Sequence, residues 1–195
     1  GVQVTARDAE GNTATAFAGN VTIAIGTNPG GGTVSGTTTV AAVAGVATFS
    51  TLSIDRSGAG YDLNATATGF TDATSTAFDI TSGAATQVVF TVQPANATAG
   101  ASITPAVQVA AQDALGNTVP GFTGNVIVTI GTNPGGGTLS GTTTVAAGAG
   151  IATFSALSIE KSGTGDTFLA TNKPPTAATR AAFTITPGGA THLGV

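Results

Sequence analysis

The sequence contains no cysteine, no methionine and no tryptophan, and it has one histidine and one tyrosine. Without cysteine, the chain can form no disulfide and offers no thiolate for a zinc site. Charged residues make up only 7% of the chain, and 5 Lys and Arg stand against 9 Asp and Glu, which leaves no basic surface for nucleic acid. No apolar run approaches the length of a membrane-spanning helix. These shortages exclude disulfide scaffolds, nucleic-acid-binding proteins and helical membrane proteins.

The composition that remains favours β-structure. Threonine makes up about a fifth of the chain, and together with valine it is a strong strand former. The 29 glycines are typical of a chain with many turns. Strong helix formers such as Glu, Lys, Gln and Leu are scarce. The composition therefore predicts an all-β protein.

A segment of 105 residues occurs twice. Val2-Gln-Val returns at Val107, which is 107 − 2 = 105 residues later, and the octapeptide GTNPGGGT at Gly26 returns unchanged at Gly131. The alignment needs no insertion or deletion, and roughly 60% of the aligned positions are identical, which indicates one duplicated folding unit. A unit of this length matches a single β-sandwich domain.

The second repeat contains about seven short segments with strand character. Polar and apolar residues alternate within several of them, and Gly, Pro and Asn separate them. The expected strands lie within residues 86–93, 102–113, 126–130, 139–145, 150–159, 167–171 and 181–186. Many short strands with regular turns predict a sandwich, so the fold class expected is all-β with two tandem immunoglobulin-like antiparallel β-sandwiches.

Four motifs in this order carry a family resemblance: Val-Gln-Val-x-Ala-x-Asp-x-x-Gly-Asn, Gly-x-Val-x-x-x-Ile, Gly-x-Ala-Thr-Phe-x-x-Leu-Ser-Ile and Gly-x-Gly-Tyr-x-Leu-x-Ala-Thr. They resemble the bacterial immunoglobulin-like (Big/invasin-type) repeats, which occur in strings in large adhesins and other surface proteins. The resemblance covers nearly the whole chain and implies fold far more than activity. The second repeat departs from it, with Asp166 in place of Tyr61 and Lys173-Pro174-Pro175 in place of Thr68-Gly69-Phe70.

Two loop motifs suggest ligand binding but have simpler explanations. Asp8, Glu10 and Asn12 alternate as the oxygen ligands of a calcium loop do, but the second repeat has Leu115 in the middle position. An Asx-type turn explains the acidic and amide residues that both repeats share. The glycine-rich loops lack the Lys-Ser/Thr pair and the helix of a phosphate-binding loop. We therefore expect turns, with no metal and no cofactor.

No set of residues suggests catalysis. His192 is the only histidine, and the equivalent position one repeat earlier is Gln87, so no base recurs beside a nucleophile. The first repeat has no lysine, which excludes a Lys–Asn isopeptide bond there, and we expect Lys161 and Lys173 to be solvated. The sequence thus predicts no catalytic, cofactor-binding or metal-binding residue and no enzymatic activity. Sites for glycan attachment stay open at three Asn-x-Thr acceptors, Asn20, Asn64 and Asn96.

The positions at which the repeats begin and end predict the domain boundaries and the partners of the chain. Gly1 aligns with Ala106, so the first repeat has no counterpart of residues 86–93, whereas Ala190–Val195 repeats Ala85–Phe90. We expect residues 1–83 to form a repeat without its first strand, 84–188 a complete repeat, and 189–195 the start of a further first strand. A sandwich that lacks an edge strand invites strand addition. Two arrangements stay open: the tail of one copy completes the next copy head to tail, or the chain is a processed product or piece of a longer protein with further repeats.

The sequence favours a structural role in an extracellular or cell-surface assembly. Repetition and the short joints at Ser82-Gly83 and Pro187-Gly188 indicate a stiff spacer. An adhesive module that recognises carbohydrate or a host protein is an alternative, and Tyr61 and Phe70 are its aromatic candidates. A non-catalytic accessory segment of a secreted enzyme is a third reading.

Overall fold

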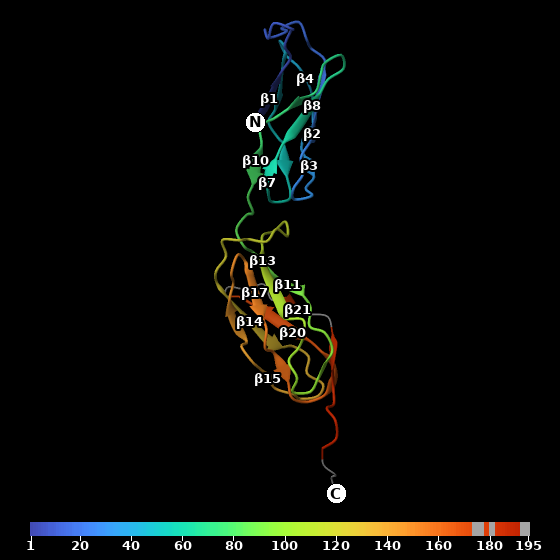
Figure 1. Ribbon diagram of the computed structural model, residues 1–195. Helices are drawn as coiled ribbons and strands as arrows, with labels where there is room; N and C mark the ends of the chain where they lie inside the picture. Colours follow the sequence, from blue (N-terminus) through green and yellow to red (C-terminus); the bar gives the residue numbers. More distant parts are fainter. Residues whose placement is uncertain (173–177, 180–181, 192–195) are drawn as a thin grey trace. The chain divides into compact units, whose positions relative to one another are not determined.

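The computed structural model of the chain describes residues 1–172, 178–179 and 182–191 (Figure 1). The chain divides into two compact units, Gly1–Ser82 (unit 1) and Gly83–Val195 (unit 2). All regular structure in the described part of the chain is β-strand. It therefore holds no helix that is long and apolar enough to cross a membrane.

Unit 1 contains ten strands in four small sheets. The largest sheet has the order β4-β2-β8-β9, and the other sheets are the pairs β1-β5, β10-β7 and β3-β6. All of these pairings are antiparallel. The strands are β1 (Val2–Thr5), β2 (Asn20–Ile25), β3 (Val34–Ser35), β4 (Thr39–Ala41), β5 (Val46–Phe49), β6 (Ser53–Ile54), β7 (Gly58–Tyr61), β8 (Leu63–Thr66), β9 (Ala73–Thr74) and β10 (Phe78–Ile80).

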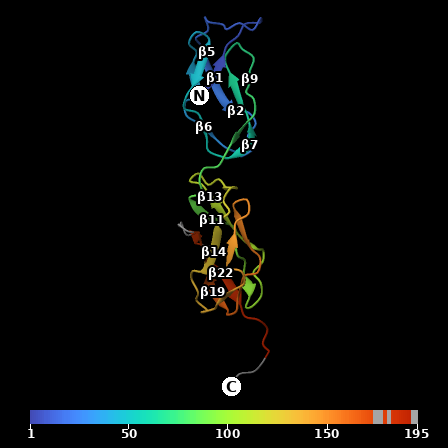
Figure 2. The same cartoon turned by 90° about the vertical axis from the view of Figure 1, so that its left-hand side faces the viewer.

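Unit 2 repeats these ten strands and adds two at its beginning. Its sheets have the orders β16-β14-β20-β21, β11-β13-β17, β12-β22-β19 and β15-β18. Figure 2 shows β11 and β13 side by side. The strands are β11 (Gln87–Val92), β12 (Ala97–Thr98), β13 (Val107–Gln112), β14 (Asn125–Ile130), β15 (Leu139–Ser140), β16 (Thr144–Ala146), β17 (Ile151–Phe154), β18 (Ser158–Ile159), β19 (Gly163–Asp166), β20 (Phe168–Thr171), β21 (Ala178–Thr179) and β22 (Phe183–Thr186).

The predicted all-β, immunoglobulin-like sandwich fold is confirmed. Each strand of unit 1 has a counterpart in unit 2 at a spacing of 105 residues, from β1 and β13 to β10 and β22. The strands are shorter and more numerous than the sequence suggested, because turns divide the expected segments. Residues 139–145, for example, contain Gly141 with φ +100°, and the chain there forms β15 and then β16.

The core of unit 2 follows the alternation seen in the sequence. In β17 and in the first half of β13, buried apolar side chains alternate with less buried ones, as expected for one buried sheet face, and Ala110 of β13 is buried as well. The sequence pattern predicts seven core residues in this repeat, of which six are buried and the seventh, Ile130, is only half-buried. The six are Val109, Val128, Phe154, Leu157, Phe183 and Ile185.

Unit 1 has a smaller core than unit 2. Val4, Leu52, Phe78 and Ile80 are half-buried, although their counterparts in unit 2 are buried. The physical reason is the absence of any strand in unit 1 that corresponds to β11 or β12, since all 82 residues of this unit are described.

The two units also place an aromatic ring differently. Tyr61 is fully buried in unit 1, its hydroxyl donates to the Arg56 carbonyl at 2.9 Å, and its ring stacks on Phe78 at 6.2 Å. In unit 2, Asp166 occupies the position of Tyr61. The ring there belongs to Phe168, and its centroid lies 4.9 Å from the ring centroid of Phe183. Burial raises the pKa of Asp166, whose Oδ2 has no hydrogen-bond partner among the described residues.

Candidate functional site

The candidate site is an open sheet edge in unit 1. β1 pairs with β5 on one side only, and β10 pairs only with β7, within a unit that the structure describes throughout. In unit 2 the counterpart of β1 pairs with both β11 and β17, and the counterpart of β10 pairs with both β12 and β19. Unit 1 therefore presents two strand edges that the same fold covers in unit 2.

A groove of three adjoining hollows runs along this edge. Their volumes are about 290, 210 and 120 Å³. Val4 and Ala65 line both the first and the second hollow, and Val2 and Leu63 line both the second and the third. Much of the lining is apolar side chain, so the groove suits another apolar chain segment better than a highly charged ligand.

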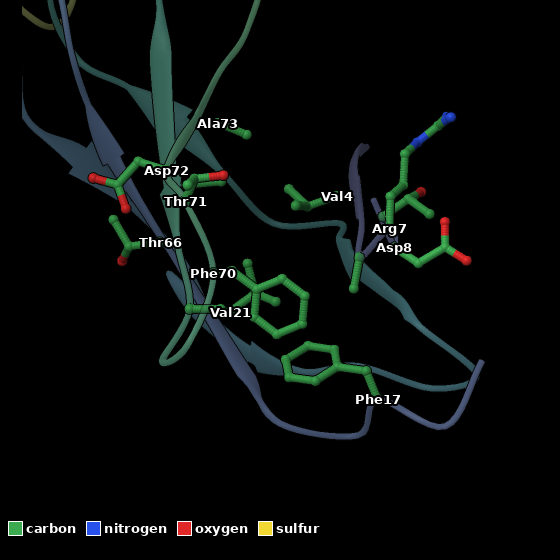
Figure 3. A pocket seen from close by; sticks show the side chains of 14 residues that line it. Val4, Arg7, Asp8, Phe17, Val21, Thr66, Phe70, Thr71, Asp72 and Ala73 are labelled. Atoms are coloured by element: carbon green, nitrogen blue, oxygen red, sulfur yellow. The ribbon is translucent and has the colours of Figure 1, made fainter. Parts of the chain in front are cut away.

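The largest hollow ends at an aromatic pair. The rings of Phe17 and Phe70 meet edge to face with their centroids 4.7 Å apart, and Figure 3 shows them beneath Val4. Phe70 is 39% exposed, one of the few large exposed apolar side chains in the described residues. Sequence reasoning named Phe70 but missed Phe17, because nothing in the sequence brings their two loops together.

The Asp8 loop at the rim of the hollow is a closed turn. The Asp8 carboxylate accepts the backbone N–H groups of Glu10 and Asn12 and the side-chain amide of Asn12, at 2.7 to 3.1 Å. These hydrogen bonds, with the Asn12 side chain first, lower the pKa of Asp8. The carboxylate thus holds its own loop together, as in the Asx-type turn expected from the sequence.

The equivalent loop of unit 2 makes one further contact. Asp113 accepts the same donors from Leu115 and Asn117, and its Oδ2 also accepts the backbone N–H of Gly83 at 2.9 Å. The Gly83 hydrogen bond is the largest cause that lowers the pKa of Asp113, to about 2. Asp113 therefore fastens the segment that leads into β11.

The glycine-rich loops are closed by asparagine side chains. Asn28 both donates to the Gly32 carbonyl and accepts the Gly32 N–H at 2.8 Å, and Asn133 does the same with Gly137 at 2.7 and 2.9 Å. The Asn side chain thus bridges four residues of backbone and fixes the turn. This arrangement leaves the loop backbone engaged with its own asparagine.

The remaining residues singled out in the sequence are scattered. Asn20 and Asn96 are exposed, and Asn96 accepts the backbone N–H of Thr184. Asn64 is half-buried, and its Oδ1 has no hydrogen-bond partner in the part of the chain that the structure describes. His192 and Lys173 lie outside the described residues. No group of three or more His, Asp or Glu side chains gathers in the described ranges.

Comparison with known proteins gives only distant similarities. No protein family and no curated protein matches the chain. The similar solved structures include FdeC, an Escherichia coli adhesin, at 22% identity and a TM-score of 0.39, where the match covers 96% of this chain and 58% of that one. Domains 4–9 of the surface layer protein SbsC match at 17% identity and a TM-score of 0.40, with 95% of this chain and 25% of that one covered.

A β-glycosidase from Bacteroides vulgatus is also similar, at 11% identity and a TM-score of 0.44, with 87% of this chain and 21% of that one covered. The chain thus spans little more than half of the FdeC structure and a quarter or less of the other two. TM-scores of this size do not establish a common function. Membership of the bacterial immunoglobulin-like repeats stays a prediction from the sequence motifs.

Proposed function

We propose that this chain is a structural repeat module of an extracellular or cell-surface protein, that it acts as a stiff spacer, and that it associates head to tail with further repeats. The observation that carries the proposal is that a sheet edge open in unit 1 is covered by β11 and β12 in unit 2, which has the same sequence type. The proposal assigns the chain no catalysis and no cofactor.

The polar side chains that both units share support a structural role. Asp8 and Asp113 close turns, and Asn28 and Asn133 close the glycine-rich loops. These residues recur at a spacing of 105 because each stabilises the same piece of backbone. A duplicated scaffold needs such residues in every copy, whereas a single binding site would need them once.

The sequence of residues 190–195 supports association with further repeats. Ala190-Thr191 repeats Ala85-Thr86, and Leu193 and Val195 stand at the positions of Val88 and Phe90, which are buried in unit 2. The tail therefore has apolar residues where a first strand needs them. An interface in which the tail of one copy meets unit 1 of the next does not close on itself unless the rotation permits, so it generates a filament.

Sedimentation and electron microscopy of the full chain test this proposal. We expect association that increases with concentration and fibres of uniform width. Leu193→Asp with Val195→Asp should abolish association, whereas His192→Gln, which introduces the residue found at the equivalent position Gln87, should leave it unchanged. Isolated particles at all concentrations would contradict the assembly, and failure to label the chain on intact, unpermeabilised cells would contradict the surface location.

The Phe17–Phe70 pair favours an adhesive role as a second candidate. Exposed aromatic rings stack on sugars, and Phe70 is exposed at the mouth of a hollow of about 290 Å³. Tyr61 cannot stack on a sugar because its side chain is fully buried. Glycan-array binding that is lost in Phe70→Ala would support adhesion, whereas an array without binding would contradict it.

A further inference from the structure

We propose that the groove along β1 of unit 1 is an acceptor for a β-strand with the sequence features of this protein's own first-strand segment, residues 84–105. This inference rests on the proposed function only in the origin of the strand. The groove itself is argued from unit 2, where the same residues surround β11 and β12.

Six pairs of identical residues show what the strand does to the sheet edge. In each pair the unit 2 member is buried and the unit 1 member is half-buried, although the amino acids and the strand order are the same. The pairs are Val107 and Val2, Val109 and Val4, Leu157 and Leu52, Ile159 and Ile54, Phe183 and Phe78, and Ile185 and Ile80. The unit 1 residues thus form an apolar face suited to the inward side chains of a further strand.

The register of β11 defines how the strand would lie. Val88 pairs with Ala111 and Phe90 with Val109, and both Val88 and Phe90 are buried. The residues equivalent to their partners are Ala6 and Val4, and Val4 lines two of the three hollows. An antiparallel strand on β1 would therefore place two apolar side chains, two positions apart, into the groove.

A second contact covers the β10 edge. Ala97 of β12 pairs in parallel with Ile185, and Asn96 accepts the Thr184 N–H at 2.8 Å. Further along the segment, the N–H of Ile103 donates to the Leu157 carbonyl, and its side chain is buried in the core of unit 2. The counterparts of Leu157 and Ile185 are Leu52 and Ile80, which line the hollow of about 120 Å³.

Asp8 marks the point where the strand would enter. Its counterpart Asp113 accepts the Gly83 N–H ahead of β11, in addition to the hydrogen bonds that both aspartates make within their loops. Asp8 has the same loop geometry at the rim of the largest hollow (Figure 3). The incoming strand should therefore begin with a small residue whose N–H reaches the Asp8 carboxylate.

The occupant is accordingly a peptide segment of defined chemistry. It carries a small residue at its start, alternating inward apolar side chains as at Val88 and Phe90, an asparagine as at Asn96, and a further apolar residue as at Ile103. Because the backbone supplies much of the pairing, the apolar positions decide which segment binds.

A synthetic peptide of residues 83–106, added to the full-length chain, tests the groove. We expect saturable binding and slower amide hydrogen exchange in β1 and β10, with no change in unit 2. A peptide with Val88→Asp and Phe90→Asp should bind about 100-fold more weakly, because two buried apolar side chains are lost. A peptide with Thr91→Ala is the matched control, since Thr91 is exposed, and it should bind like the parent peptide.

The possible outcomes distinguish the acceptor groove from the proposed head-to-tail association. Protection of β1 in a chain that stays monomeric would support the acceptor groove and contradict head-to-tail association. Protection of β1 together with loss of chain association would support both. No protection at peptide concentrations up to about 1 mM, or equal binding of the Asp-substituted peptide, would overturn the acceptor groove.

Discussion

The carboxylate of Asp113 accepts the backbone N–H of Gly83 at 2.9 Å, across 30 residues of sequence. This hydrogen bond ties the start of β11 to the loop that follows β13. Asp8, the equivalent aspartate of unit 1, makes only the bonds within its own loop that Asp113 also makes. Asp113 thus links a turn to the segment ahead of β11 in unit 2, whereas the Asp8 carboxylate closes only its own turn in unit 1.

The Asp113 contact predicts a loss of stability in acid. Its pKa falls from an ordinary 3.8 to about 2 in the folded state, so the folded form binds the proton less readily than the unfolded form. The stabilisation is present above pH 4 and is lost as the pH falls from about 4 towards 2. Urea unfolding followed by circular dichroism should show that the free energy of unfolding decreases as the pH falls from about 4 towards 2. Asp113→Asn should reduce this pH dependence. An unchanged pH dependence in the variant would contradict the assignment.

Phe154→Ala should destabilise unit 2 by about 3–5 kcal/mol, because the ring is 1% exposed and its removal leaves a cavity. Phe49, its counterpart in unit 1, is equally buried, so Phe49→Ala should cost a similar amount. Unit 1 contains the only tyrosine, Tyr61, and the chain has no tryptophan, so tyrosine fluorescence follows unit 1 alone. A Phe154→Ala variant whose tyrosine transition shifted as far as its circular dichroism transition would contradict this prediction.

Asp166→Asn should stabilise unit 2 at pH 7 by about 1–3 kcal/mol, since a buried charged oxygen without a partner carries a desolvation cost of that order. The folded pKa of Asp166 is raised, so its contribution favours folding at low pH and is lost as the pH rises through the raised pKa. The stabilisation by the variant should therefore shrink on acidification. A variant that is equally stabilised at all pH values would show that the charge is not the cause.

Gly141→Ala should destabilise unit 2 by about 1–3 kcal/mol, because Gly141 has φ +100°, which side chains rarely adopt, and a Cβ there would collide with the Ala156 carbonyl. Gly136→Ala is the matched control. Gly136 has φ +61° and open space around it, so the cost there should be about 1 kcal/mol. Equal unfolding midpoints for the two variants would contradict the role of the Gly141 backbone.

Much of the fold could be predicted from the sequence because the repeat has no gaps. Equal spacing keeps inward and outward positions in phase, so the alternation at Val107 and Val109 reappears at Val2 and Val4. Local pattern was sufficient for these features.

Burial could not be predicted from the same pattern. Phe78 and Phe183 are identical residues in the same motif, but Phe183 lies on a strand that β12 covers and Phe78 lies on a strand without such a neighbour. Likewise, the aromatic ring that contacts Phe183 belongs to Phe168, two residues after Asp166, which is the counterpart of Tyr61. The Phe17–Phe70 contact joins two loops and has no periodic signal. Each of these features depends on neighbours that are distant in sequence.

The pairing of β12 with β22 also constrains the order in which unit 2 can form. Ala97 pairs with Ile185, and Asn96 accepts the Thr184 N–H across 88 residues. These contacts of β12 cannot form until β22, the last strand, is in place. Contacts of such sequence separation slow folding, because a long loop must close before they are made. On the ribosome, β12 would find its partner only after residues 183–186 have left the exit tunnel. Until then β12 and β19 lack the strand that joins them in the sheet order β12-β22-β19.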